Sequence, residues 1–294
     1  MTDRTIHTWI DEPLYDITVI LPTRGRKQPL MDSLMSLVDL AQDVSKIQIL
    51  LGFDNDDREC IQWCADNIIP EMTRRGVLCT VFEFNPMGYI KLNQYVNGLA
   101  KYAGGRWMMF WNDDAVMQTQ DWDKRITEKN GQFRVLRMKT HNLHPYAIFP
   151  IVPREWFILF NYLSPHQISD AWISQVGFLA NIVETIDVDV LHDRHDLTGN
   201  NHDDTFKNRP MLEGNHTHPA DFNHESWRRH RFSDAGKIAW YLHSLGQDVS
   251  WFQEVAKGQR DPWARMLSSE FDPNQQTKVF FDSKLNTQST EKHE

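Results

Sequence analysis

Four short apolar runs alternate with helical hydrophobic stripes along the first 115 residues, and this alternation limits the fold more than any other feature of the chain. The runs, which predict buried strands, cover residues 17–21, 47–53, 78–84 and 107–111. The stripes, which predict amphipathic helices, cover residues 30–41, 61–69 and 92–103. Strands and helices in this alternating order predict a parallel sheet with right-handed crossovers.

Charged and flexible residues follow each predicted strand at its carboxyl end. In an open sheet of this kind, ligands bind just beyond these ends. The segments that follow the strands are 22–26, 54–57, 85–88 and 112–114. Together they carry two arginines, several carboxylates and two glycines, a concentration of charge that a purely structural edge does not need. The sequence therefore predicts a binding site along this edge of the sheet.

The second half of the chain is less regular. Apolar patterns predict three further strands at 133–138, 147–152 and 186–191, and two helices at 169–182 and 237–245. Residues 193–224 are rich in His, Asn, Asp and Gly, which predicts a long loop. The polar residues near the C-terminus predict a tail that frays.

These patterns together predict the fold class and the domain organisation. We expect an α/β fold with a Rossmann-like, mostly parallel sheet flanked by helices, followed by an irregular α+β half. A single domain is expected over residues 1–270, with its two halves at 17–125 and 126–270 and a polar tail at 271–294.

Composition limits the function and the compartment. The net charge of −9 argues against a protein held to nucleic acid by a broad basic field, although it leaves room for a local basic groove. Cys60, Cys64 and Cys79 provide no disulfide framework and indicate a reducing compartment. The N-terminus lacks the layout of a signal peptide, and the most apolar stretch, 147–160, is too short and too charged to span a bilayer. We expect a soluble, cytoplasmic protein.

Asn112, Asp113 and Asp114 directly follow the fourth predicted strand. Three polar side chains just past an apolar strand are costly to bury without a partner. Carboxylates suit hard cations such as Mg²⁺ or Mn²⁺, which are often held by one or two carboxylates together with substrate phosphate. Such a cation can neutralise the charge that develops on a diphosphate leaving group. The motif therefore predicts a site for a divalent metal and a phosphate-bearing substrate.

Four features in this order resemble the GT-A fold glycosyltransferases, and especially their large family-2-like group. The first is the turn that follows the first strand, with Pro22, Thr23, Arg24 and Arg26. The second is an Asp after the second strand, and the third is a Gly-, Lys- and Asn-containing segment at 88–93. The fourth is the acidic motif at 112–114, which departs from the usual pattern at its first position, Asn112. The resemblance covers residues 17–125.

This resemblance implies a nucleotide-sugar-dependent hexosyl- or pentosyltransferase, with a UDP-sugar favoured as the donor. It assigns nucleotide and diphosphate contacts to Pro22, Thr23, Arg24, Arg26, Asp54, Lys91 and Asp113. It assigns the divalent metal to Asp114, and to a late His that corresponds best to His192. The alternative for His192 is a solvated polar loop, and the alternative for Asp54 is a solvated turn.

The acceptor side is less well defined by the resemblance. Inverting members of the family place an Asp or Glu base near the start of a helix, and Asp170 is the best match. An ionised Asp170 would accept the proton of the acceptor hydroxyl; the alternative is that it caps the helix. The acceptor stays open between a glycan and a hydroxymethylated DNA base, for which the basic and aromatic stretch at 227–231 is the motivation. The oligomeric state is also open.

Two other functional classes compete with this hypothesis. A nucleotidyltransferase of related fold usually has a Gly-rich signature after the first strand, whereas the segment 22–26 has a single Gly. A non-catalytic glycan-binding module would not need so many charges at the sheet edge. The chain has neither GxGxxG after its first strand nor GxxxxGK[ST], which argues against dinucleotide oxidoreductases and P-loop nucleotidases.

Overall fold

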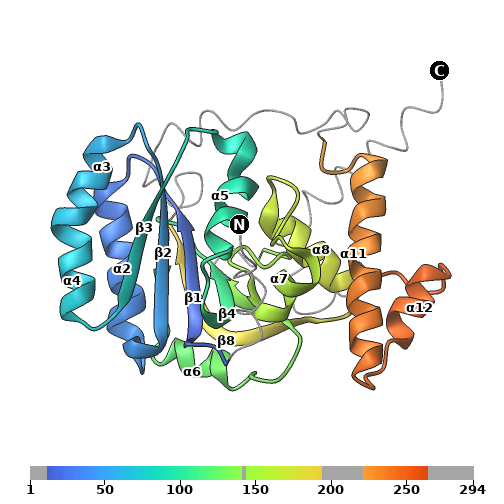
Figure 1. Cartoon of the computed structure of the whole chain (residues 1–294). Coiled ribbons are helices and arrows are strands. Elements are labelled where there is room, and N and C mark those ends of the chain that lie inside the picture. Colours follow the sequence, from blue (N-terminus) through green and yellow to red (C-terminus); the bar gives the residue numbers. More distant parts are fainter. Residues whose placement is uncertain (1–11, 141–143, 194–220, 264–294) are drawn as a thin grey trace.

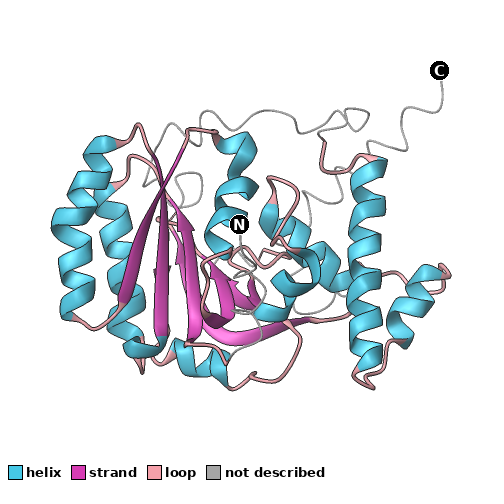
Figure 2. Cartoon of the chain, in the orientation of Figure 1, coloured by secondary structure: helices cyan, strands magenta, loops and turns pink. Residues whose placement is uncertain are grey.

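A computed structural model describes residues 12–140, 144–193 and 221–263 (Figure 1). The predicted tail at 271–294 and most of the predicted loop at 193–224 lie outside the described residues. The described part is a mixed α/β fold in which helices flank an eight-stranded sheet on both faces (Figure 2), as expected from the sequence.

The first half follows the predicted alternation closely. Its strands are β1 (Tyr15–Pro22), β2 (Ile47–Asp54), β3 (Leu78–Phe84) and β4 (Gly105–Phe110). Its helical elements are α2 (Lys27–Leu40), η1 (Val44–Lys46), α3 (Arg58–Trp63), η2 (Cys64–Ile68), α4 (Ile69–Arg74), η3 (Tyr89–Lys91) and α5 (Leu92–Ala100). A single π-helical turn, η2, joins α3 to α4 just before Pro70, which has no N–H for a regular helical ladder. The four strands and the three helical regions predicted here are confirmed.

The strand order places β1 at the centre of the parallel part of the sheet. The full order is β3-β2-β1-β4-β7-β6-β8-β5, and β1 pairs in parallel with both β2 and β4. The chain therefore moves outward from β1 to β2 and β3, and then returns to the other side of β1 with β4. This reversal creates a switch point between β1 and β4, where the loops after the two strands diverge and leave a crevice.

Each central strand packs against both helical layers because its side chains alternate between the faces. Ile17, Val19 and Leu21 of β1 belong to the core that includes α2, α3 and α4, which lie together on one side of the sheet in Figure 1. Ile20 belongs to the core on the other face, built with α5, α7, α8 and α11. Burial on both faces explains why the strands are continuous apolar runs.

The second half departs from the predicted boundaries. It contains β5 (Ala115–Met117), α6 (Trp122–Thr127), β6 (Val135–Thr140), β7 (Ile151–Pro153), α7 (Arg154–Phe160), α8 (Ser169–Leu179), β8 (Val183–His192), α11 (Glu225–Ser244) and α12 (Ser250–Ala256). The predicted strands at 133–138 and 186–191 and the predicted helix at 169–182 correspond to β6, β8 and α8. The predicted strand at 147–152 was too long, since β7 begins only after Pro150. The predicted helix at 237–245 is the last part of the longer α11.

Two further expectations concern cysteines and membrane spans. Cys60, Cys64 and Cys79 are free, and the first two are buried in the core beside α3 and α4. Among the described residues, no helix has both the length and the hydrophobicity that crossing a bilayer requires.

Candidate functional site

A cavity of about 300 Å³ lies at the carboxyl ends of β1, β2 and β4, at the switch point of the sheet. Its walls also include the first turn of α8 and the last residue of β8. The predicted site residues on this cavity are Pro22, Thr23, Arg24, Arg26, Asp54, Asp113, Asp114, Asp170 and His192. Residues that are distant in sequence thus meet at the carboxyl ends of the strands, the edge that the sequence predicted.

Asp113 is held by two side chains from the segment after β1. Thr23 Oγ1 donates a hydrogen bond to Asp113 Oδ2 at 2.5 Å, and Arg26 Nη1 donates to Asp113 Oδ1 at 2.6 Å. The parallel pairing of β1 with β4 brings these segments together, because both strands end at the same edge. Asp113 is only 8% exposed, so its orientation is fixed by partners inside the protein.

Arg26 also reaches the second carboxylate, Asp114. Its Nη1 lies 3.3 Å from Asp114 Oδ2, so one guanidinium is shared between two adjacent buried carboxylates. Burial raises the pKa of Asp113 to about 6, although the charge of Arg26 works against this shift. Burial also acts to raise the pKa of Asp114, but His192 and Arg26 outweigh it and leave that pKa below its ordinary value.

Asp114 and His192 approach each other through strand pairing. In the antiparallel pair of β5 and β8, Ala115 is in register with His192, and the backbone N–H of Asp193 donates to the carbonyl of Asp114 at 2.7 Å. His192 Nε2 consequently lies 3.4 Å from Asp114 Oδ1, and both residues are less than a tenth exposed. The edge of the His192 ring faces Phe149, with 5.0 Å between ring centroids.

These two residues fit a divalent cation as a pair of protein ligands. Asp114 Oδ1 is a buried oxygen without a hydrogen-bond partner in the described part of the chain, and it faces an imidazole nitrogen. Within residues 12–140, 144–193 and 221–263, no group of three or more His, Cys, Asp or Glu side chains could hold a metal ion. A cation here would therefore take its remaining ligands from substrate phosphate and water, as Mg²⁺ commonly does. The metal role of Asp114 and His192 stays a prediction.

Asp54 ends β2 on the other side of β1 and is also held from two directions. Tyr95 of α5 donates a hydrogen bond from its hydroxyl to Asp54 Oδ1, and Arg24 Nη1 donates to Asp54 Oδ2 at 2.6 Å. The Tyr95 oxygen accepts the backbone N–H of Met87 at 2.7 Å. Asp54 is 7% exposed, so it is a fixed carboxylate and not part of a solvated turn.

Tyr95 lies on the cavity wall and Lys91 does not, while the contact of Lys91 with the nucleotide stays a prediction. Tyr95 lines the cavity, although the sequence assigned it only to the hydrophobic stripe of the third helix. A tyrosine within such a stripe was the available signal, since a buried phenol hydroxyl usually needs a polar partner. Lys91, which was predicted to contact the nucleotide, ends η3 and is exposed, and the cavity is lined instead by its neighbours Gly88, Tyr89 and Leu92.

Asp170 lines the same cavity from the first turn of α8. The N-cap residue of α8 is Ile168, and the cap includes no side-chain hydrogen bond, so Asp170 does not cap the helix. Its side chain is half-buried and lines the cavity. The arrangement leaves a carboxylate available to a bound molecule.

The basic stretch at 227–231 does not line this cavity. It forms the first part of α11, where Arg228 and Arg229 are exposed and Arg231 is 3% exposed. Arg231 Nη1 donates to the carbonyl of Phe222 at 2.8 Å, and burial lowers the Arg231 pKa to about 10. Trp227, His230 and Arg231 contact the Trp172 ring of α8, so these residues pack α11 against α8, whereas Arg228 and Arg229 are exposed.

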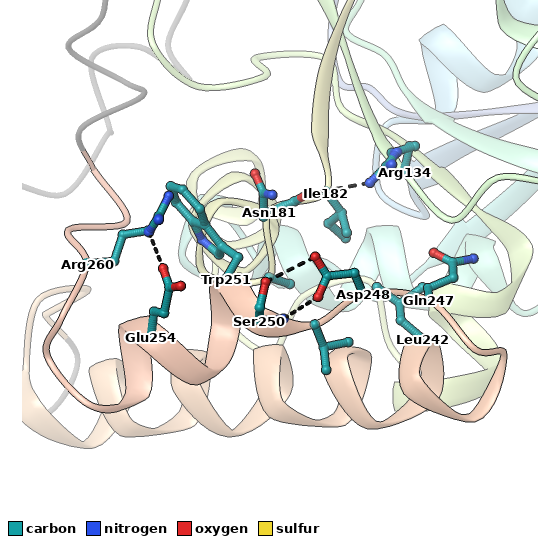
Figure 3. A pocket seen from close by; sticks show the side chains of 12 residues that line it. Arg134, Asn181, Ile182, Leu242, Gln247, Asp248, Ser250, Trp251, Glu254 and Arg260 are labelled. Atoms are coloured by element: carbon teal, nitrogen blue, oxygen red, sulfur yellow. Dashed lines mark hydrogen bonds and ion pairs between the residues drawn. The ribbon is translucent and has the colours of Figure 1, made fainter.

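A second cavity, of about 410 Å³, lies where the end of α8 meets α11 and α12 (Figure 3). Its charged side chains pair among themselves or with the backbone. Arg260 pairs with Glu254 at 2.5 Å, and Asp248 accepts hydrogen bonds from the amide and hydroxyl of Ser250 at 2.9 and 3.0 Å. These contacts hold α12 in place, which makes the first cavity the stronger candidate for a functional site.

No protein-family model matches the chain, and no curated protein sequence matches it. Solved structures do match. S. aureus TarS 1–349 in complex with UDP-GlcNAc aligns with a TM-score of 0.55 and 15% identity, over 90% of this chain and 75% of that chain. The Pyrobaculum calidifontis mannosyltransferase PcManGT, in complex with GDP-Man and Mn²⁺, aligns with a TM-score of 0.50 and 10% identity, over 99% of this chain and 94% of that chain.

Two further TarS structures match over a smaller share of their length. The chain spans 60% of TarS 1–349 in complex with UDP and 36% of another TarS structure, with TM-scores of 0.47 and 0.44. At such low identities, similarity concerns the arrangement of helices and strands. The chain has the GT-A glycosyltransferase fold.

Proposed function

We propose that this protein is a metal-dependent glycosyltransferase that moves a sugar from a nucleotide-sugar donor to a hydroxyl acceptor. The observation that carries the proposal is the cavity at the switch point of the sheet. Arg24, Arg26 and the acidic pair line it from the segments after β1 and β4, and Asp170 lines it from the first turn of α8. The arginines and the acidic pair suit a nucleoside diphosphate with its cation, and the Asp170 carboxylate suits an acceptor.

The donor would lie along the ends of β1, β2 and β4. Asp54 is a fixed acceptor for an N–H group of the base, and Arg24 and Arg26 suit the diphosphate because a guanidinium can donate two parallel hydrogen bonds to phosphate oxygens. TarS, which has the same fold, is described in complex with UDP-GlcNAc, and this supports a UDP-sugar as the donor. Pro22, Thr23 and Asp113 would complete the donor side.

Asp114 and His192 would hold the divalent metal. PcManGT is described in complex with GDP-Man and Mn²⁺, which supports a divalent cation in this fold. When bound, Mn²⁺ or Mg²⁺ would neutralise charge on the diphosphate. The protein holds Asp114 in place through the backbone contact with Asp193, and it keeps both ligands away from bulk water.

Asp170 is proposed as the general base. Its carboxylate would accept the proton of the acceptor hydroxyl as the oxygen bonds to the anomeric carbon and the bond to the diphosphate breaks. Direct attack from the side opposite the leaving group inverts the configuration of the anomeric carbon. Asp170 lines the same cavity as the donor-side residues, as this role requires.

The acceptor is proposed to be a glycan or a hydroxymethylated DNA base. Transfer of a labelled sugar to hydroxymethylated DNA, with unmodified DNA and a glycan panel in parallel, separates the two. The net charge of −9 and the position of the 227–231 stretch outside the lining of this cavity favour the glycan. Sugar on the hydroxymethylated DNA alone would favour the modified base.

The central experiment measures donor use in the absence of any acceptor. Purified protein with Mn²⁺ or Mg²⁺ is incubated with a panel of nucleotide sugars, and slow hydrolysis and binding are recorded. Asp114→Ala should abolish hydrolysis, whereas Asp32→Ala, which removes an exposed carboxylate on α2, should not. No binding and no hydrolysis of any donor would contradict the proposal. Pyrophosphate release from a nucleoside triphosphate would instead favour a nucleotidyltransferase.

A further inference from the structure

The guanidinium of Arg26 occupies the space between the two carboxylates of the acidic pair. We propose that Arg26 is a resident cation, which weakens metal binding at Asp114 until a donor diphosphate draws the guanidinium away. Metal and donor then bind cooperatively, through the movement of one side chain. This inference rests on the proposed function, because it assigns the order of binding at the same site.

The geometry of Arg26 supports a resident cation and not a surface ion pair. Its side chain is 14% exposed, and those of Asp113 and Asp114 are 10% and 8% exposed. Nη1 lies 2.6 Å from Asp113 Oδ1 and 3.3 Å from Asp114 Oδ2. The backbone of Arg26 is fixed just after β1, at the position that precedes α2. The side chain can therefore swing while its anchor stays in place.

Charge balance explains why a cation is present before the metal arrives. Two adjacent buried carboxylates repel each other, and in a site screened from water this repulsion is costly. One guanidinium beside both carboxylates offsets part of that cost. The same positive charge opposes a divalent cation that approaches Asp114 Oδ1 and His192, because like charges at short range repel strongly in a buried site.

A donor diphosphate would change this balance. It offers phosphate oxygens on the cavity side of Arg26, and guanidinium groups bind phosphate at least as well as carboxylate. If Arg26 turns to the diphosphate, its charge no longer opposes the metal at Asp114. By thermodynamic linkage, the metal must raise the affinity for the donor by the same factor as the donor raises the affinity for the metal.

Arg24 provides a matched control on the rim of the same cavity. It carries the same charge, but its guanidinium pairs with Asp54 at 2.6 Å and with Asp56 at 2.5 Å. In the part of the chain that the structure describes, Arg24 forms no ion pair with Asp113 or Asp114. Removing the Arg24 charge should therefore leave the intrinsic metal affinity largely unchanged, whereas removing the Arg26 charge should increase it.

The test is the affinity for Mn²⁺ alone, measured by titration calorimetry on the full chain without nucleotide. Arg26→Gln should bind Mn²⁺ at least about fivefold tighter than the wild type, at the lower end of typical coupling between sites. Arg26→Lys keeps the charge and should bind Mn²⁺ less tightly than Arg26→Gln. Arg24→Gln should match the wild type. Unfolding temperatures are recorded for all variants, and Arg26→Lys keeps the comparison meaningful if Arg26→Gln is unstable.

The second measurement adds UDP, with GDP in a parallel series and nucleotide-only blanks. UDP should tighten Mn²⁺ binding by a larger factor in the wild type than in Arg26→Gln. Equal or weaker Mn²⁺ binding by Arg26→Gln without nucleotide would overturn the inference while leaving the metal site intact. An identical effect of nucleotide in both proteins would also overturn it. Absence of Mn²⁺ binding in every protein, with and without nucleotide, would overturn the metal assignment itself.

Discussion

Gly105 begins β4, which pairs in parallel with β1 below the site. An ideal Cβ at this position would lie 2.5 Å from the backbone nitrogen of Thr18, 2.7 Å from Thr18 Oγ1 and 2.8 Å from the carbonyl carbon of Ile17. Two of these neighbours are backbone atoms of β1, which is paired on both sides and cannot shift alone. The substitution Gly105→Ala should therefore separate β1 from β4 locally.

The magnitude follows from two contributions. Overpacking in a filled core costs about 1–3 kcal/mol, and contact with backbone atoms at these distances places Gly105→Ala at the upper end of that range. Separation of the strands also strains the hydrogen bond from the Gly105 amide to Thr18 Oγ1, now 2.9 Å long, which contributes about 1 kcal/mol. We expect a loss of about 3–4 kcal/mol in the free energy of unfolding. For a chain of this size, the melting temperature should fall by roughly 6–16 °C.

The assay is thermal unfolding followed by circular dichroism, with the neighbouring glycine as control. A Cβ at Gly104 would lie 3.2 Å from a ring carbon of Tyr15, which can move, so Gly104→Ala should cost less than about 1 kcal/mol. The reasoning would be refuted if Gly105→Ala melted at the wild-type temperature. An equal fall for both variants would also refute it, since the argument depends on backbone contact at one glycine only.

Three further predictions concern the site. Tyr95→Phe removes a hydrogen bond to the Asp54 carboxylate. We expect UDP binding that is weaker by about tenfold or more in titration calorimetry, since hydrogen bonds to charged groups contribute about 1.5–3 kcal/mol. Unchanged affinity would mean that Asp54 needs no support from Tyr95. Thr23→Val removes a hydrogen-bond donor to the buried Asp113 and should lower the free energy of unfolding in urea by about 1–3 kcal/mol. The control is Thr127→Val, which removes an exposed hydrogen bond to the carbonyl of Lys124 on α6. Asp170→Asn should abolish transfer to the acceptor while donor binding persists, and transfer at the wild-type rate would exclude Asp170 as the base.

The donor side of the site could be predicted from the sequence because it depends on short strands and on the residues that directly follow them. Each strand of the first half is a short apolar run, and the carboxyl ends of parallel strands lie at one edge of a sheet. Thr23, Arg26 and Asp113 were therefore expected to be near each other, and the structure brings them into contact. Their hydrogen bonds were not expected, since side-chain orientation depends on packing.

Other residues of the site show what sequence patterns do not predict. His192 reaches Asp114 only because β5 and β8 pair in antiparallel register, and β5 was too short to be recognised. Tyr95 looked like one more apolar position of a helix, because the partner of its hydroxyl comes from a different strand. Lys91 matched a family segment, yet the turn at η3 leaves it exposed.

The sequence by itself determined the fold class, the four strands of the first half and the edge of the sheet that carries charge. These features follow from periodicity and from the residues at strand ends, both of which are local. The tertiary structure alone decided the order of the strands, the pairing of His192 with Asp114 and the shared position of Arg26 between two carboxylates. Such contacts join residues far apart in the chain, so their energies depend on the whole packed core and not on any local pattern.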